Sequence, residues 1–234
     1  MYILLMKKIC IVINARVNSS RCYKKMIYPI GDTCLIEIII NKLLRSKIPI
    51  NDIFLASPDK EIEDIVNKYG MQFIKRSKES NNGEFDITII MEWYKELMEK
   101  YTHVILINPS LPLLKIKTIN EFYNFCINNT YDRIFSVKST KNYFFDTNNN
   151  PINFKPGILN TKYVEPLIEG GHCLYLTKLE DIKNNNYLGN FIDKSNPYLY
   201  VLNNEELYDI DHQYEFDIIK YYIKENIDNL YLNE

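Results

Sequence analysis

The feature that most constrains the fold is a series of short apolar runs separated by segments of helical spacing. Ile9–Ile13 and His103–Ile107 consist almost entirely of β-branched and other apolar residues, with no polar alternation. A run of this length and composition is typical of a strand that is buried on both faces. Strands of this kind occur mainly in parallel sheets whose two faces are covered by helices.

Apolar residues between these runs recur at helical spacing, so that strands and helices are expected to alternate along the chain. The expected strands are Ile9–Ile13, Ile53–Ala56, Met71–Ile74, His103–Ile107, Arg133–Val137, His172–Thr177 and Tyr198–Leu202. The expected helices are Thr33–Ser46, Asp59–Tyr69, Asp86–Lys100, Thr118–Asn128, Leu179–Asn184 and His212–Lys224. The alternation predicts an α/β fold: a Rossmann-like, mostly parallel sheet with helices on both faces. A ligand crevice is expected at the carboxyl ends of its strands.

One segment interrupts the alternation. Residues 138–170 are rich in Asn, Pro and aromatic residues and have no clear period. The length of 234 residues suits one domain. We therefore expect a single domain over residues 1–234 with a small insertion at 138–170.

Composition excludes several classes of partner. The chain has 28 basic and 30 acidic residues, a net charge of -2, so nucleic acid is not expected as a partner. No stretch approaches the about 18 apolar residues of a membrane span, and a cytoplasmic protein is expected. Five cysteines without CxxC spacing favour buried thiols over a zinc site or a disulfide framework.

A basic loop follows the first expected strand. Arg16, Arg21, Lys24 and Lys25 place four positive charges within ten residues, next to the expected crevice. Backbone N–H groups and cations in such a loop suit a polyphosphate. A solvated basic loop is the alternative interpretation.

A turn with two prolines follows the fourth strand, at Ile107–Leu113. Prolines stiffen such a turn, which then either lines the crevice or simply ends the strand. Of the three histidines, all expected to be structural, His172 is the one to follow, because it succeeds a pair of glycines.

Two carboxylates precede the last expected helix. Asp209 and Asp211 lie two residues apart, so on an extended segment both side chains face the same side. Two convergent carboxylates together with phosphate oxygens are suitable ligands for Mg²⁺. The alternative is that Asp211 caps the helix that follows.

These motifs resemble the sugar-activating cytidylyltransferases, specifically the acylneuraminate (CMP-sialic acid synthetase-like) and spore-coat polysaccharide branches. The matching stretches are Ala15-Arg16-x-x-Ser19-x-Arg21-x-x-x-Lys25, Pro29–Glu37, Ile107–Leu113, Pro166–Tyr175 and Asp209–Phe216. A weaker match is Arg76, followed by Asp86-Ile87-Thr88. The resemblance implies a fold of the nucleotide-diphospho-sugar transferase type.

The resemblance also implies an activity: a nucleotidyltransferase that couples CTP to a sugar acid and releases pyrophosphate and a CMP-sugar. It assigns the triphosphate to Arg16, Arg21 and Lys25, which would act in catalysis with Asp211. It further assigns nucleotide contacts to Ala15, Ser19, Arg76, Asn108 and Ser110, and Mg²⁺ to Asp209 and Asp211. A homodimer is implied, with the 138–170 segment crossing to the partner.

Two other functions are compatible with the sequence. Nucleotide-sugar glycosyltransferases also carry an Asp-x-Asp pair, but at the end of a mid-chain strand, where this chain has Asn108-Pro109. A non-catalytic nucleotide-binding homologue is the second, motivated by Val17-Asn18 in place of loop glycines and by Leu114 in place of an arginine. The acceptor and the base preference stay open.

Overall fold

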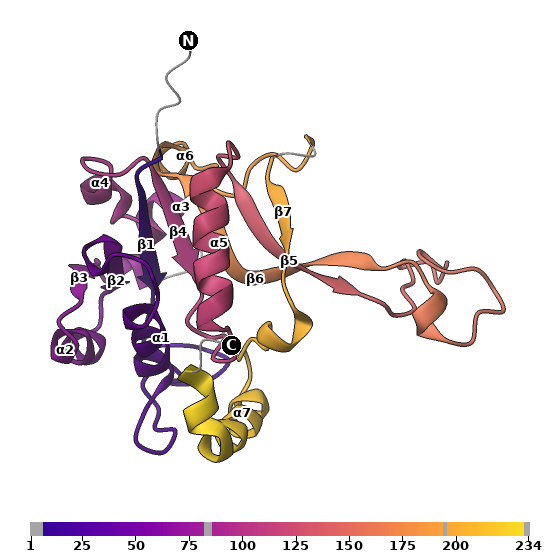
Figure 1. Ribbon diagram of the computed structural model, residues 1–234, viewed down its shortest axis with the longest axis horizontal. Helices are drawn as coiled ribbons and strands as arrows, with labels where there is room; N and C mark the ends of the chain where they lie inside the picture. Colours follow the sequence, from indigo (N-terminus) through magenta and orange to yellow (C-terminus); the bar gives the residue numbers. More distant parts are fainter. Residues whose placement is uncertain (1–6, 82–85, 194–195, 232–234) are drawn as a thin grey trace, which may run out of the picture.

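The computed structural model describes residues 7–81, 86–193 and 196–231; the ends of the predicted 1–234 domain lie outside these ranges. A seven-stranded sheet with the order β3-β2-β1-β4-β6-β5-β7 forms the centre of the molecule (Figure 1). The strands are β1 Ile9–Asn14, β2 Ile53–Ser57, β3 Gln72–Lys75, β4 His103–Ile107, β5 Ile134–Thr140, β6 Leu167–Lys178 and β7 Tyr198–Val201. Only β6 runs antiparallel to its neighbours β4 and β5, which confirms the predicted mostly parallel sheet.

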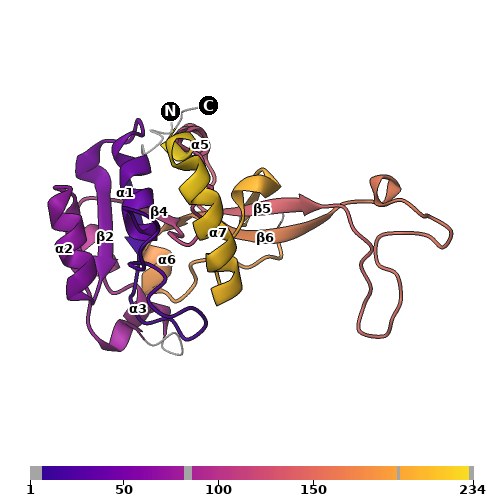
Figure 2. The same cartoon turned by 90° about the horizontal axis from the view of Figure 1, so that it is seen from below.

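Alternation along the buried strands supplies two separate cores. In β1, Ile11 and Ile13 face one core, and Cys10 and Val12 face the other. The helices are α1 Leu35–Leu44, α2 Lys60–Lys68, α3 Ile87–Ile90, α4 Tyr94–Leu97, α5 Ile116–Asn128, α6 Leu179–Lys183 and α7 Gln213–Asn226. Helices α1, α2, α5 and α7 contribute to the first core, and α3, α4 and α6 to the second. Figure 2 shows helices on both sides of the sheet, as the sequence predicts.

The single helix predicted over Asp86–Lys100 is wrong, because two short helices, α3 and α4, occupy this segment. The Arg76 guanidinium donates to the carbonyl oxygen of Ile90 at 2.8 Å, at the end of α3. Met91 then leaves helical geometry, with φ -112° and ψ 32°. The apolar spacing continues through this break because Trp93 is buried in the same core.

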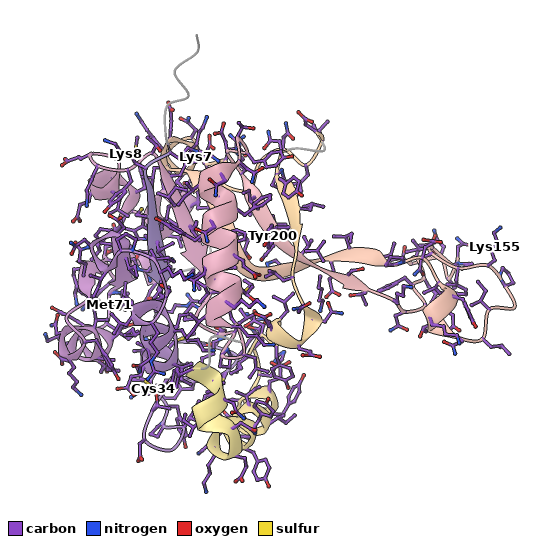
Figure 3. The ribbon with its side chains drawn as sticks, in the orientation of Figure 1. Lys7, Lys8, Cys34, Met71, Lys155 and Tyr200 are labelled. Atoms are coloured by element: carbon purple, nitrogen blue, oxygen red, sulfur yellow. The ribbon has the colours of Figure 1, made fainter. Side chains whose placement is uncertain are left out.

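Strands β5 and β6 extend beyond the rest of the sheet as a two-stranded ribbon, paired from Lys138↔Glu169 to Thr140↔Leu167. We call residues 138–170 the arm; it projects far from the body of the molecule (Figure 1), and Lys155 lies near its far end (Figure 3). Its base is therefore regular strand, one of the two outcomes, β-rich or irregular, that its composition favours. The arm exposes large apolar side chains: Phe145, Ile152, Leu159, Tyr163 and Ile168.

Two further predictions concern the cysteines and membrane-spanning segments. All five cysteines are buried and free. In the described ranges, no helix combines the length and the apolar character needed to cross a membrane.

Candidate active site

A cavity of about 520 Å³ opens at the carboxyl ends of β1 and β4, where the topology predicts a ligand crevice. The loop after β1, the turn after β4, the segment before α7 and strand β6 all contribute to its walls. Nine of the ten residues predicted to form the site line it: Ala15, Arg16, Ser19, Arg21, Lys25, Asn108, Ser110, Asp209 and Asp211. The topology thus brings together motifs that are almost 200 residues apart.

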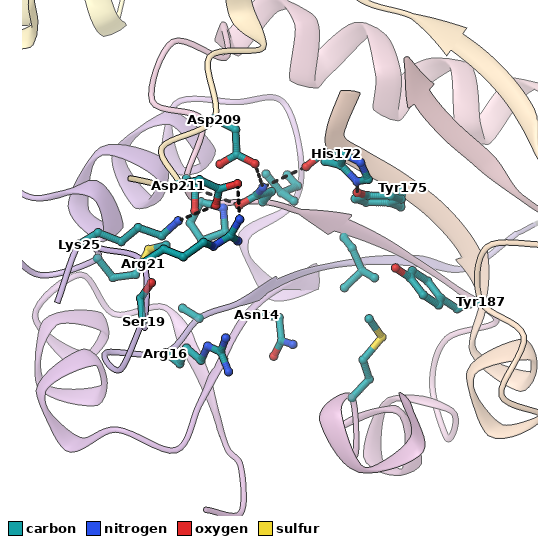
Figure 4. A pocket seen from close by; sticks show the side chains of 18 residues that line it. Asn14, Arg16, Ser19, Arg21, Lys25, His172, Tyr175, Tyr187, Asp209 and Asp211 are labelled. Atoms are coloured by element: carbon teal, nitrogen blue, oxygen red, sulfur yellow. Dashed lines mark hydrogen bonds and ion pairs between the residues drawn. The ribbon is translucent and has the colours of Figure 1, made fainter. Parts of the chain in front are cut away.

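The loop after β1 is tied to the neighbouring β2–α2 connection. The Ala15 amide donates to the carbonyl oxygen of Ala56 at 3.0 Å, and the Val17 amide donates to Asp59 Oδ2 at 2.6 Å. Val17 is buried in the core, whereas Arg16 on one side of it is exposed. The loop therefore presents its cations from one side of the cavity, as Figure 4 shows for Arg16, Arg21 and Lys25.

Two of these cations interact with a predicted metal ligand. Arg21 Nη1 lies 2.8 Å from Asp211 Oδ2, and Lys25 Nζ lies 3.6 Å from Asp211 Oδ1. Lys25 is largely buried and also donates to the carbonyl oxygen of Ile210, whereas 59% of the Arg21 side chain is exposed. Lys25 is consequently held in place, while Arg21 is free to turn toward an anion in the cavity.

The segment Asp209–Asp211 points both carboxylates into the cavity because Ile210 between them is fully buried in the core. The Ile210 amide donates to the Ser110 carbonyl oxygen at 3.1 Å, which ties this segment to the turn after β4. His212, not Asp211, is the N-cap residue of α7, and the Glu215 carboxylate accepts from the amides of Asp211 and His212, each at 2.7 Å. The Asp211 side chain is therefore available to the site.

Asp209 is the more buried of the two carboxylates. Asn108 Nδ2 donates to its Oδ2 at 3.2 Å, while its buried Oδ1 has no hydrogen-bond partner. Burial and the neighbouring Asp211 charge raise the pKa of Asp209 above its usual value. An unpaired buried carboxylate oxygen beside a second carboxylate fits Mg²⁺, which is often held by one or two carboxylates and substrate phosphates. The described residues contain no cluster of three or more His, Cys, Asp or Glu that could hold a metal.

Asn108 organises the centre of the site. Its Oδ1 accepts from the Ser110 amide at 2.9 Å, while its Nδ2 donates both to Asp209 and to the carbonyl oxygen of His172 at 3.0 Å. One side chain thus joins the turn after β4, the segment before α7 and strand β6. The turn at Ile107–Leu113 both ends the strand and forms part of the cavity wall.

Arg76 is the one predicted site residue that is not among the cavity-lining residues. It is 4% exposed, and its guanidinium donates to the carbonyl oxygens of Ala15 at 3.2 Å and Ile90 at 2.8 Å. Burial lowers the pKa of Arg76 to about 10, which leaves it cationic at neutral pH. The structure places Arg76 behind the loop, where it supports the backbone of Ala15.

The wall opposite the cationic loop contains residues that the sequence did not assign to the site: Met91, His172, Tyr175 and Tyr187. His172 Nδ1 lies 2.9 Å from the Tyr175 hydroxyl, and the Tyr175 ring stacks on Phe135 at 5.2 Å. The signals in the sequence were the glycine pair before His172 and the matching stretch Pro166–Tyr175. A Cβ at Gly171 would lie 3.0 Å from the Ser136 carbonyl oxygen, so the backbone approaches too closely for a side chain.

Comparison with known proteins begins with the sequence. The profile of a family described as cytidylyltransferase matches residues 9–165. An uncharacterised protein of Methanocaldococcus jannaschii is 26% identical over 141 residues, which cover 58% of this chain and 52% of that protein. The chain thus spans about half the length of this relative.

Three solved structures share the fold over most of this chain. CMP:2-keto-3-deoxy-manno-octonic acid synthetase complexed with CTP is 13% identical, with a TM-score of 0.65 and coverage of 94% of this chain and 99% of that one. The 4-diphosphocytidyl-2C-methyl-D-erythritol synthase from Anaerococcus prevotii is 17% identical, with a TM-score of 0.60 and coverage of 93% of this chain and 96% of that one. A cytidylyltransferase from Leptospira borgpetersenii is 16% identical, with a TM-score of 0.56 and coverage of 97% of this chain and 98% of that one. At these identities the similarity concerns the fold.

Proposed function

The chain belongs to the cytidylyltransferase family, and we propose that it transfers the cytidylyl group of CTP to a hydroxyl group of a sugar acid. The observation that carries this proposal is the convergence of the cationic loop and the Asp209–Asp211 pair in one cavity at the carboxyl ends of the strands. The cations match a triphosphate, and the carboxylates match the ion that accompanies it.

The proposed reaction forms a bond between the acceptor oxygen and the α-phosphorus of CTP and releases pyrophosphate. Enzymes achieve such transfers mainly by positioning the reactants and neutralising charge. Arg16, Arg21 and Lys25 bind the triphosphate, and Arg21 turns from Asp211 toward the phosphates as CTP enters. Asn108 and Ser110, with Ala15 and Ser19 of the loop, position the nucleoside, while Arg76 acts through the Ala15 carbonyl.

Asp209 and Asp211 are the proposed Mg²⁺ ligands. Asp209 offers its buried, unpaired Oδ1, and Asp211 offers the carboxylate that Arg21 and Lys25 contact. Magnesium, when bound, supplies charge neutralisation and polarisation of the phosphate oxygens. Arg21 and Lys25 hold the Asp211 carboxylate at the mouth of the cavity until CTP and the ion arrive.

The acceptor is proposed to be a sugar acid of the sialic-acid or related type, and the chain to act as a homodimer. The name of the CMP:2-keto-3-deoxy-manno-octonic acid synthetase, which shares this fold, includes such an acid. The exposed apolar side chains of the arm favour burial against a second copy. A partner's arm also carries Lys162, a cation suited to an acceptor carboxylate.

A thermal-shift panel tests nucleotide binding. CTP, UTP, ATP and GTP are each added with and without Mg²⁺; a ligand at 100 times its Kd stabilises by about 2.7 kcal/mol. We expect the largest shift with CTP and Mg²⁺, followed by pyrophosphate release in the presence of sugar acids. A shift with CMP-sugars and none with CTP contradicts the proposal and favours a glycosyltransferase. CTP binding without turnover for any acceptor favours a non-catalytic homologue.

A further inference from the structure

We propose that His172 is the group that accepts the proton of the attacking hydroxyl, and that Tyr175 and Asn108 hold it in position for this step. The inference rests on the proposed cytidylyl transfer and adds a residue on the acceptor side of the cavity. It depends on the division of the cavity into two walls, on the backbone at His172 and on the partners of its ring.

The unequal charge of the two walls sets the direction of attack. Among the lining residues that the structure describes, every lysine and arginine lies on the loop after β1, and the opposite wall carries His172, Tyr175 and Tyr187 (Figure 4). The leaving pyrophosphate carries most of the charge of CTP and so belongs with the cations. The attacking and leaving oxygens are roughly in line across phosphorus. The acceptor therefore enters from the wall that contains His172.

The backbone of His172 is held in an unusual conformation. Its φ is 47°, in the left-handed region that few non-glycine residues adopt, and such strain often marks functional sites. Asn108 Nδ2 donates to the His172 carbonyl oxygen at 3.0 Å and also donates to Asp209. The histidine is thus linked through one amide group to the proposed metal ligand.

The ring of His172 is fixed by its neighbours. Its Nδ1 lies 2.9 Å from the Tyr175 hydroxyl, and its edge meets the Phe135 ring, with centroids 5.7 Å apart. Burial raises the pKa of Tyr175, so the phenol keeps its proton at neutral pH. In the tautomer that carries hydrogen on Nδ1, the Tyr175 oxygen accepts that hydrogen. Nε2 lies on the side of Gly170, 3.2 Å from the position a Cβ would take there, and its lone pair is left for a proton.

The proposed step transfers the cytidylyl group to the acceptor oxygen and the hydroxyl proton to His172. The acceptor oxygen forms a bond to the α-phosphorus, and the bond from that phosphorus to the oxygen bridging to the β-phosphate breaks. The electron pair of the broken bond leaves with pyrophosphate, and the hydroxyl proton passes to His172 Nε2. Asp209, Asp211 and Tyr187 are the other titratable groups that share this part of the cavity. Asp211 stays beside the buried Lys25 and is a proposed Mg²⁺ ligand, which leaves it less suited to accept a proton.

The test compares His172→Ala, His172→Gln and Tyr175→Phe with His212→Asn, which keeps a side-chain acceptor at the N-cap of α7. The His212 ring stacks on Tyr214, and His212 is not among the cavity-lining residues. Two readouts are used: the thermal shift with CTP and Mg²⁺, and pyrophosphate release with a panel of sugar acids and with water alone as acceptor. Loss of a proton acceptor typically costs on the order of 100-fold or more in rate. Added imidazole measures chemical rescue of the His172→Ala protein.

We expect both His172 variants to keep the CTP shift and to lose about 100-fold in pyrophosphate release. Imidazole should restore part of the rate to His172→Ala but not to His172→Gln, and Tyr175→Phe should lose less than either. Turnover of both His172 variants near the wild-type rate, or no rescue by imidazole, overturns the inference. A wild-type protein that neither binds CTP nor releases pyrophosphate instead contradicts the proposed function itself.

Discussion

The two walls of the cavity are built in different ways. The cationic wall comes from one loop, in which Arg16, Arg21 and Lys25 lie within ten residues of each other. The opposite wall draws on separate elements: Met91 follows α3, His172 and Tyr175 belong to β6, and Tyr187 follows α6. Functional residues that lie close together in one loop can be recognised in the sequence, whereas residues that separate elements bring together are recognised only in the folded structure.

Substitutions in the two walls are also expected to differ in their effect on the free energy of folding. Arg21 is mostly exposed, and exposed ion pairs contribute little to the free energy of folding. Tyr175 is stacked on Phe135 between the strands and is mostly buried. A change at the exposed Arg21 should therefore alter ligand affinity alone, while changes at buried residues in or behind either wall should also alter stability. The following predictions separate these effects.

The largest expected effect is on turnover. Asp211→Asn removes a proposed Mg²⁺ ligand between the two walls, and we expect pyrophosphate release to fall by about 10³-fold. The melting temperature should change little, because the pairs of Asp211 with Arg21 and Lys25 lie at the open cavity. Asp217→Asn, an exposed change on α7, is the control. Unchanged turnover in the Asp211 variant would rule out the metal assignment.

The second effect is on stability. Arg76→Met leaves the buried carbonyls of Ala15 and Ile90 without their donor, and we expect about 2–4 kcal/mol of destabilisation in urea unfolding. Arg76→Lys keeps a cation at the site and should recover part of that loss. Because the Ala15 backbone borders the cavity, CTP affinity should also fall in the Met variant. Wild-type stability and affinity in Arg76→Met would show that the guanidinium does not support the loop.

A third effect concerns affinity alone. Arg21→Met should weaken CTP binding by roughly 10-fold, because one charge-assisted contact to the phosphates is lost. The unfolding midpoint should stay unchanged. Lys24→Met is a matched control from the same loop, since Lys24 is not among the cavity-lining residues. Isothermal titration of both variants decides the point: equal affinities would assign the loop only a general electrostatic role.

The smallest effect on the cavity is expected from the arm. Leu159 is 96% exposed, and Leu159→Asp should weaken self-association while leaving CTP binding intact. Sedimentation velocity across a range of concentrations measures the change. A wild-type protein that stays monomeric at the highest concentration would contradict the proposed dimer.

Local patterns predicted much of the fold and one wall of the site. The alternation of buried strands and amphipathic helices indicated the mostly parallel sheet, and the charges of residues 16–25 indicated the cationic loop. Asp209 and Asp211 converge as expected, because Ile210 between them is an apolar residue that the core takes up.

Interactions between distant segments account for what the sequence did not predict. The helix over 86–100 breaks where Arg76, 14 residues earlier, bonds the Ile90 carbonyl. The choice between cap and ligand for Asp211 depended on the start of α7, where His212 is the N-cap residue and the Glu215 carboxylate accepts from the amides of Asp211 and His212. No pattern in the sequence places Tyr187 in the site, since an aromatic side chain near a buried strand has the same pattern whether or not it borders a cavity.

The most direct test of the account follows the phosphorus atoms of CTP. Phosphorus NMR of CTP, Mg²⁺, the protein and a panel of sugar acids distinguishes the possible products in one experiment. The account predicts equal amounts of pyrophosphate and of a new phosphodiester that contains the α-phosphorus, and neither product with Asp211→Asn. Unchanged CTP under conditions in which a CMP-sugar is consumed would contradict cytidylyl transfer.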